Sequence, residues 1–298
     1  MNLIGEYQNG NYRTSIFDDG TKIRETKEDI FIPNFPESFD LKITNYCDAL
    51  CPMCHEGSTS YGLHGDILNP KFINTLQPYT ECSIGGGDPL SHPDLLEFLQ
   101  ILKSKNIIAN ITVNQKRFLE SQEFIQKLVN DKLIYGLGIS VMKANDNLIK
   151  MIQKYPNAVI HVINGIIDEN NLGKMYNKNL KLLILGYKEF RRGKYFYSIE
   201  VENKKLKMYN LLPKILNKFK VVSFDNLAIK QLDVKRLLSE DKWNEFYMGD
   251  DGQYTMYIDL VENKFAKSSI SEVRYNLLDN IVDMFNIVRS ENIVMKDN

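Results

Sequence analysis

The distribution of hydrophobic residues changes near residue 37. Before that point the chain is polar and rich in turns, and Asn9-Gly10 and Asp19-Gly20 lie beside short β-prone runs at 12–17 and 21–24. Asn-Gly and Asp-Gly pairs between such runs are typical of tight turns between strands. We therefore expect residues 1–36 to form a short N-terminal β appendage.

From residue 39 onward, apolar runs of five to eight residues alternate with longer amphipathic segments. This alternation predicts βα units around a parallel sheet. Six strands are expected at 39–44, 82–85, 107–113, 134–141, 158–163 and 180–187. Helices are expected to begin at Asn69-Pro70 and to span 93–105 and 118–129. Ligands of such sheets bind at the carboxyl ends of the strands, so we look for function there.

The pattern changes again after about residue 220. A helix is expected over 234–246, then a hairpin-like stretch at 253–267, then a last helix near 277–288. We interpret this segment as a C-terminal α+β cap. The predicted division is 1–36, 37–222 and 223–298.

Composition removes several classes of function. The 298 residues are 43% hydrophobic and carry a formal net charge of −1, so the protein has no overall positive field to attract polyanions. Residues 188–220 hold ten Lys or Arg against three Glu. Because this run lacks the regular alternation of basic and aromatic residues that single-strand binders use, it favours a solvated helix face over a nucleic-acid site. The start of the chain lacks a signal-peptide pattern and no apolar run approaches membrane-spanning length, which predicts a cytoplasmic protein without membrane contact.

Three of the four cysteines, Cys47, Cys51 and Cys54, lie within eight residues directly after the first predicted strand of the parallel series. Thiolates select zinc or iron-sulfur clusters. Three ligands leave one coordination position open, because closed sites normally take four. His55 and Cys82 are poor fourth ligands. The alternatives are a zinc knuckle and a Cys51/Cys54 redox pair.

The spacing Cys-x3-Cys-x2-Cys after the first strand of a βα series resembles the radical S-adenosylmethionine (radical SAM) superfamily. The segment Ser83-Ile84-Gly85-Gly86-Gly87-Asp88-Pro89-Leu90 ends the second strand, where that family carries a Gly-Gly-Glu-Pro type segment. The resemblance covers about residues 38–190. It implies a partial (βα)6 barrel and a [4Fe-4S] cluster on Cys47, Cys51 and Cys54.

The resemblance also implies a set of residues around S-adenosylmethionine. Glycine lets a backbone approach a ligand closely, and a carboxylate can accept a hydrogen bond from an ammonium group. Two residues differ from the family pattern: Met53 stands where an aromatic residue is common, and Asp88 replaces Glu. The expected cofactor-binding residues are Met53, Gly85, Gly86, Gly87, Asp88, Pro89, Asn114 and Ser140.

An enzyme of this family cleaves S-adenosylmethionine reductively to a 5′-deoxyadenosyl radical, which abstracts hydrogen from a substrate. The resemblance implies an electron donor such as flavodoxin or ferredoxin. Only Cys82 is left outside the motif, which excludes an auxiliary cluster ligated by cysteines alone. A peptide or protein side chain is the first substrate hypothesis, because the appendage and the cap would frame an open sheet end. A nucleotide or other small-molecule substrate, and a non-catalytic zinc-binding module, are the alternatives.

Overall fold

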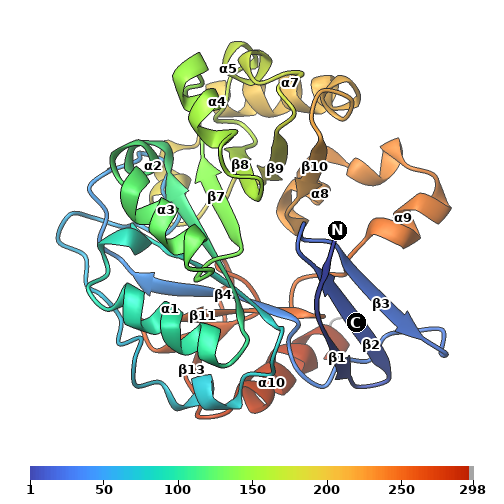
Figure 1. Ribbon diagram of the computed structural model, residues 1–298. Helices are drawn as coiled ribbons and strands as arrows, with labels where there is room; N and C mark the ends of the chain where they lie inside the picture. Colours follow the sequence, from blue (N-terminus) through green and yellow to red (C-terminus); the bar gives the residue numbers. More distant parts are fainter. Residues whose placement is uncertain (295–298) are drawn as a thin grey trace.

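The computed structural model describes residues 1–294, with side chains through residue 291. Its architecture is mixed α/β, with a small antiparallel sheet and a large, mostly parallel one. The small sheet contains β1 (Leu3–Asn9), β2 (Tyr12–Phe17) and β3 (Lys22–Thr26) in sequence order. Figure 1 shows it as a separate unit beside the large sheet.

Within the described residues the large sheet has ten strands, in the order β10-β9-β8-β7-β6-β5-β4-β11-β12-β13. The strands from β10 to β11 are parallel to their neighbours, and β12 and β13 are antiparallel. Their bounds are β4 Ser38–Thr44, β5 Glu81–Gly86, β6 Ile108–Asn114, β7 Gly136–Ser140, β8 Ala158–Ile163, β9 Lys181–Leu185, β10 Val221–Phe224, β11 Thr255–Asp259, β12 Lys264–Ala266 and β13 Tyr275–Asn276.

Most of the helices connect these strands and cover the outer face of the sheet, whereas α9 lies away from it (Figure 1). They are α1 Leu95–Ser104, α2 Gln115–Glu120, α3 Gln122–Asn130, α4 Asp146–Ile152, α5 Glu169–Lys174, α6 Arg192–Phe196, α7 Ile199–Ile215, α8 Asn226–Leu232, α9 Glu240–Phe246 and α10 Ile281–Val294. Short 3-10 segments are η1 Lys71–Thr75, η2 Pro89–Ser91 and η3 Val234–Leu237. No helix in the described part of the chain is both long enough and apolar enough to span a membrane.

The six predicted parallel strands are confirmed as β4 to β9. The helix predictions were less accurate. The segment after Asn69-Pro70 forms only the 3-10 turn η1, and the helix expected over 118–129 is two helices that meet at Ser121. The helix expected over 234–246 is η3 followed by α9, because Ser239 caps a new helix by accepting from the backbone N–H of Lys242.

Two strands extend the sheet beyond the expected core. β10 pairs with β9, and the expected boundary at residue 222 falls inside it. At the other end β11 pairs with β4 in parallel, with Ile258 opposite Leu41. The sheet therefore takes strands from both sides of that boundary.

Alternation along β4 to β9 gives the sheet two different faces. One face carries the apolar residues that pack under the helices, such as Leu41, Ile84 and Ile111. The other carries mainly polar and glycine residues. In register across neighbouring strands these include Tyr257, Asp40, Ser83, Asn110 and Gly136. A polar sheet face of this kind is suited to hold a ligand.

Candidate functional site

The three clustered cysteines lie on the segment that follows β4, which we call the cysteine loop (residues 45–62). The loop folds back on itself: the N–H of Cys47 donates to the carbonyl of Thr59 at 2.8 Å, and that of Thr59 donates to Asn45 at 3.0 Å. The N–H of Cys54 closes a turn onto the carbonyl of Cys51 at 3.2 Å. All three thiols are free and half-buried. The loop thus presents three available sulfur ligands at the carboxyl end of the sheet.

The thiols influence one another electrostatically. Burial raises the pKa of Cys51, and negative charge on Cys54 or Cys47 raises it further. Burial also raises the pKa of Cys47, with Asp88 and Cys54 acting in the same direction. Three thiolates therefore need a cationic partner in order to ionise together, which an iron-sulfur cluster or a metal ion would supply. Within residues 1–294, no three His, Cys, Asp or Glu side chains are grouped closely enough to hold a single metal ion.

Cys82 takes no part in this group. It is fully buried on the apolar face of β5, where desolvation raises its pKa well above the ordinary value. It packs in the core with Phe39 and Ile84. In this position Cys82 acts as a small buried hydrophobic residue.

The glycines that end β5 have two different roles. A Cβ on Gly87 would lie 2.1 Å from the carbonyl oxygen of Tyr46, and one on Gly86, whose φ is +114°, would lie 2.4 Å from that of Thr44. At these two positions the absent side chain lets β5 approach the end of β4 and the start of the cysteine loop. At Gly85, no described atom lies within 4 Å of a Cβ, so this position does face open space.

Backbone hydrogen bonds join the two sequence motifs into one site. The N–H of Gly87 donates to the carbonyl of Thr44 at 2.7 Å, and that of Asp88 donates to Tyr46 at 2.7 Å. Asp88 is close enough for its charge to act on Cys47. The glycine segment and the cysteine loop are thus fixed relative to each other before any ligand binds.

Asp88 is almost fully buried, with 1% of its surface exposed, and it is only partly satisfied. Its Oδ2 lies 2.6 Å from Nε of Arg117 and accepts a hydrogen bond from Ser91 at 2.5 Å. Its Oδ1 has no hydrogen-bond partner among the described residues. A buried carboxylate oxygen without a partner is costly, and a ligand ammonium group is one group that could satisfy it.

The remaining expected cofactor residues are distributed around this carboxylate. Pro89 begins η2 directly after Asp88. Asn114 caps α2 by accepting from the N–H of Arg117 at 2.9 Å, so it orients the arginine that pairs with Asp88. Ser140 ends β7 and lies in register with Asn114.

Met53 lies where the cysteine loop meets the far side of the sheet. It is 8% exposed and packs with Tyr187 and Val201, and with Ile163 and Ile166 at the end of β8. The structure therefore brings Met53 together with the end of β8.

A buried network of charged side chains joins the cysteine loop to β4 and β11. The sequence analysis missed this network. Lys42 on β4 is 1% exposed, and its Nζ lies 3.2 Å from Glu56 and 3.0 Å from Asp259 on β11. Glu56 also contacts Nε2 of His55 at 3.2 Å, and His55 lies 3.5 Å from Nζ of Lys188. Although burial opposes its ionisation, His55 and Lys42 hold the pKa of Glu56 well below the usual range. No local spacing signals this network, because Lys42 and Asp259 are 217 positions apart.

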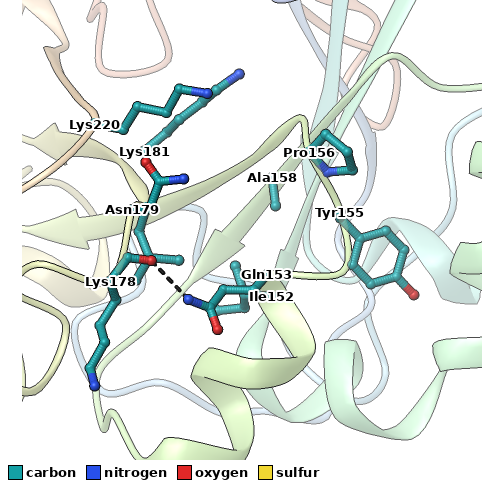
Figure 2. Close-up of a pocket in the computed structure, with 10 residues that line it drawn as sticks. Ile152, Gln153, Tyr155, Pro156, Ala158, Lys178, Asn179, Lys181 and Lys220 are labelled. Carbon is teal, nitrogen blue, oxygen red and sulfur yellow. Dashed lines mark hydrogen bonds between the residues drawn. The ribbon is translucent and has the colours of Figure 1, made fainter.

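A separate pocket of about 310 Å³ lies at the opposite end of the strands. Its lining includes Ala158 at the start of β8 and Lys181 at the start of β9. Figure 2 shows the side chains of Lys181 and Lys220 side by side, with that of Lys178 pointing away from them. This pocket contains none of the expected site residues.

Comparison with solved structures shows which known fold the chain resembles. No protein-family model and no curated protein matches the sequence. Among solved structures, the chain is similar to SuiB of Streptococcus suis bound to S-adenosylmethionine, with a TM-score of 0.60 and 14% identity over 87% of this chain and 69% of that one. The chain therefore shares the overall fold of this S-adenosylmethionine-bound protein.

Two further solved structures share this fold. SuiB bound to the precursor peptide SuiA matches with a TM-score of 0.59 and 14% identity, over 87% of this chain and 68% of that one. A hexahistidine-tagged form of anSMEcpe with bound AdoMet matches with a TM-score of 0.54 and 15% identity, over 85% of this chain and 77% of that one. At these identities the likeness is one of fold.

Proposed function

We propose that this protein is a radical SAM enzyme whose sheet from β4 to β9 is the family's partial (βα)6 barrel. Cys47, Cys51 and Cys54 would hold a [4Fe-4S] cluster. The observation that carries the proposal is the pair of backbone hydrogen bonds from Gly87 and Asp88 to the strand end and loop that carry the cysteines. They make one site out of the two motifs that, together, resemble the family.

The residues of the chain would divide the work of binding the cofactor. Bound there, the cluster and S-adenosylmethionine supply a 5′-deoxyadenosyl radical that removes a hydrogen atom from the substrate. Oδ1 of Asp88 is available to accept from the cofactor's ammonium group, and the open space at Gly85 leaves room for the methionine moiety. Met53 would cover the adenine with its polarisable sulfur, against the end of β8. Asn114 and Ser140 would complete the polar side.

We propose a peptide or protein side chain as the substrate. SuiB, which shares the fold, has been solved with a precursor peptide bound. The polar inner face of the sheet, with Asp40, Ser83 and Asn110, would receive the reacting side chain. An electron donor such as flavodoxin or ferredoxin would act from outside the cysteine loop. A cytoplasmic location would keep the thiols reduced.

The decisive experiment is anaerobic reconstitution with iron and sulfide, followed by dithionite and S-adenosylmethionine. We expect formation of 5′-deoxyadenosine, measured by chromatography. The triple variant with Cys47, Cys51 and Cys54 replaced by Ala should lose both iron and product. The matched control Cys82→Ala should keep both, because this thiol is in the core. One equivalent of zinc without iron or sulfide in the wild type would instead indicate a zinc-binding module.

The cofactor side of the site is tested separately. Gly85→Ala places a methyl group in open space, so the fold and the iron content should be retained while S-adenosylmethionine binds more weakly. Asp88→Ala should also weaken cofactor binding and spare the iron. Loss of iron with normal cofactor binding in either variant would contradict this division of roles.

A further inference from the structure

We propose that Lys42 is a positioning residue that fastens the cysteine loop to strand β11 through Glu56 and Asp259. These three residues are called the Lys42 network below. The fastening is a property of the fold. Its importance for iron binding rests on the proposed function.

The geometry places Lys42 at the junction of three segments. It lies near the end of β4, five positions before Cys47, and is opposite Asp259 in the β4/β11 register. Glu56 lies two positions after Cys54 and reaches the same ammonium group. The cysteine loop is therefore held at its start by β4 itself and at its far side by Glu56, with Lys42 as the common partner.

Other groups fix the two carboxylates in place. Oδ1 of Asp259 accepts from the N–H groups of Val261 and Glu262, at 3.0 Å each, so this carboxylate is held by its own turn. Nη1 of Arg274 lies 3.6 Å from Oδ2 of Asp259, and the arginine stacks over the ring of Tyr257. The ammonium group of Lys42 thus contacts two carboxylates. One is Asp259 on the C-terminal hairpin formed by β11 and β12, and the other is Glu56 on the cysteine loop.

Contacts outside the Lys42 network also join the cysteine loop to β11 and to the residues that follow it. Nη1 of Arg191 donates to the carbonyl of Glu56 at 2.5 Å, and its Nη2 lies 2.7 Å from Glu262. Tyr257 on β11 donates to Oε2 of Glu56 at 3.4 Å. Every one of these contacts converges on Glu56 or on the residues that follow β11. The C-terminal hairpin therefore supports the cysteine loop directly, in addition to extending the sheet.

Placing a lysine in this position is costly unless its charge is fully paired. A buried ammonium group with two carboxylates in contact is stabilised only in a defined geometry, and removing one partner leaves an uncompensated charge. In several proteins such networks specify one arrangement of the segments they join. We infer that this one specifies the arrangement in which the loop presents its three sulfurs.

The test compares two double variants. Lys42→Met/Asp259→Asn removes one positive and one negative charge, keeps an acceptor for the Asp259 turn, and leaves Glu56 with His55. The matched control Lys22→Met/Glu81→Gln removes a partly buried pair joined at 2.7 Å at the other end of the sheet, and leaves Glu37 with Arg24. Both should lower global stability.

Amide hydrogen exchange of the iron-free proteins separates local from global effects. In Lys42→Met/Asp259→Asn we expect exchange across residues 45–62 to accelerate about tenfold relative to the control variant. Equal acceleration of the loop in both variants would overturn the proposal. Should the double variant fail to fold, Asp259→Asn alone retains the Lys42–Glu56 pair and should accelerate the loop about threefold, and no change in that variant would equally refute the role.

A second measurement concerns iron. After anaerobic reconstitution, the Lys42→Met/Asp259→Asn variant should take up about half or less of the wild-type iron, and the electron paramagnetic resonance signal of its reduced cluster should change shape. The Lys22→Met/Glu81→Gln control should match the wild type in both. If the wild type itself binds no iron, the proposed function fails, while the exchange measurement still decides whether Lys42 fastens the loop.

Discussion

Asp40 offers a prediction whose sign and magnitude follow from its position. The residue lies in the middle of β4 on the polar face of the sheet, and its carboxylate makes no hydrogen bond or ion pair within the described part of the chain. Although its side chain is exposed to solvent, desolvation by the surrounding protein atoms raises its pKa to about 6, opposed by Lys188 and reinforced by Asp251 and Asp225. We predict that Asp40→Asn stabilises the protein at neutral pH.

The sign follows from proton binding in the two states. An unfolded aspartate titrates near pH 4, whereas Asp40 in the folded protein titrates near pH 6. Between these two pH values the folded state binds more protons than the unfolded state. The free energy of unfolding therefore falls as the pH rises from 4 to 6. Two pKa units correspond to about 3 kcal/mol for a fully desolvated carboxylate. Because water reaches the Asp40 side chain, screening reduces the expected effect to about 1 kcal/mol.

The assay is urea unfolding of wild type and Asp40→Asn at several pH values. We expect the variant to be more stable by about 1 kcal/mol at pH 7.5, with the difference vanishing near pH 4. Asp19→Asn is a control with the opposite pKa shift, because the N–H of Thr21 lowers the pKa of Asp19. Removing this carboxylate should not stabilise the protein. A difference between Asp40→Asn and wild type that does not vary with pH would refute the reasoning.

Three further stability predictions use urea unfolding as well. Gly87→Ala should cost more than about 2 kcal/mol, since its Cβ would overlap a backbone oxygen, whereas Gly85→Ala should cost less than about 1 kcal/mol. Arg117→Leu leaves Asp88 buried without its cation and should cost about 3 kcal/mol at pH 7. Despite burial, neighbouring cations hold the pKa of Glu37 below its usual value, so Glu37→Gln should destabilise at pH 7, and the loss should shrink as acid protonates the wild-type carboxyl.

The sequence predicted the elements that local patterns determine. The apolar runs of β4 to β9 are clear because these strands are buried under helices on one face and bounded by turns. β10 was missed, since Val221–Phe224 is four residues long and no more than half-buried. The parallel pairing of β11 with β4 was missed for a different reason: strand partners distant in sequence leave no local periodicity.

The candidate site divides in the same way. The three cysteines and the Gly85–Asp88 segment are contiguous, and their spacing carries chemical information. Lys42 and Glu56 gave no signal, because each is an ordinary charged residue until the fold brings it to Asp259. Arg117 was also missed, although the N-cap at Asn114 directs it toward Asp88.

The late position of β11 in the chain has a consequence for biosynthesis. While the ribosome is still adding the residues before 255, β4 has no neighbour on one side, and its Phe39, Leu41 and Ile43 belong to an open sheet edge. Open edges of this kind recruit strands from other molecules. A nascent chain that stops before β11 is therefore expected to bind chaperones and to aggregate. This tendency ends when β11 is synthesised and pairs with β4.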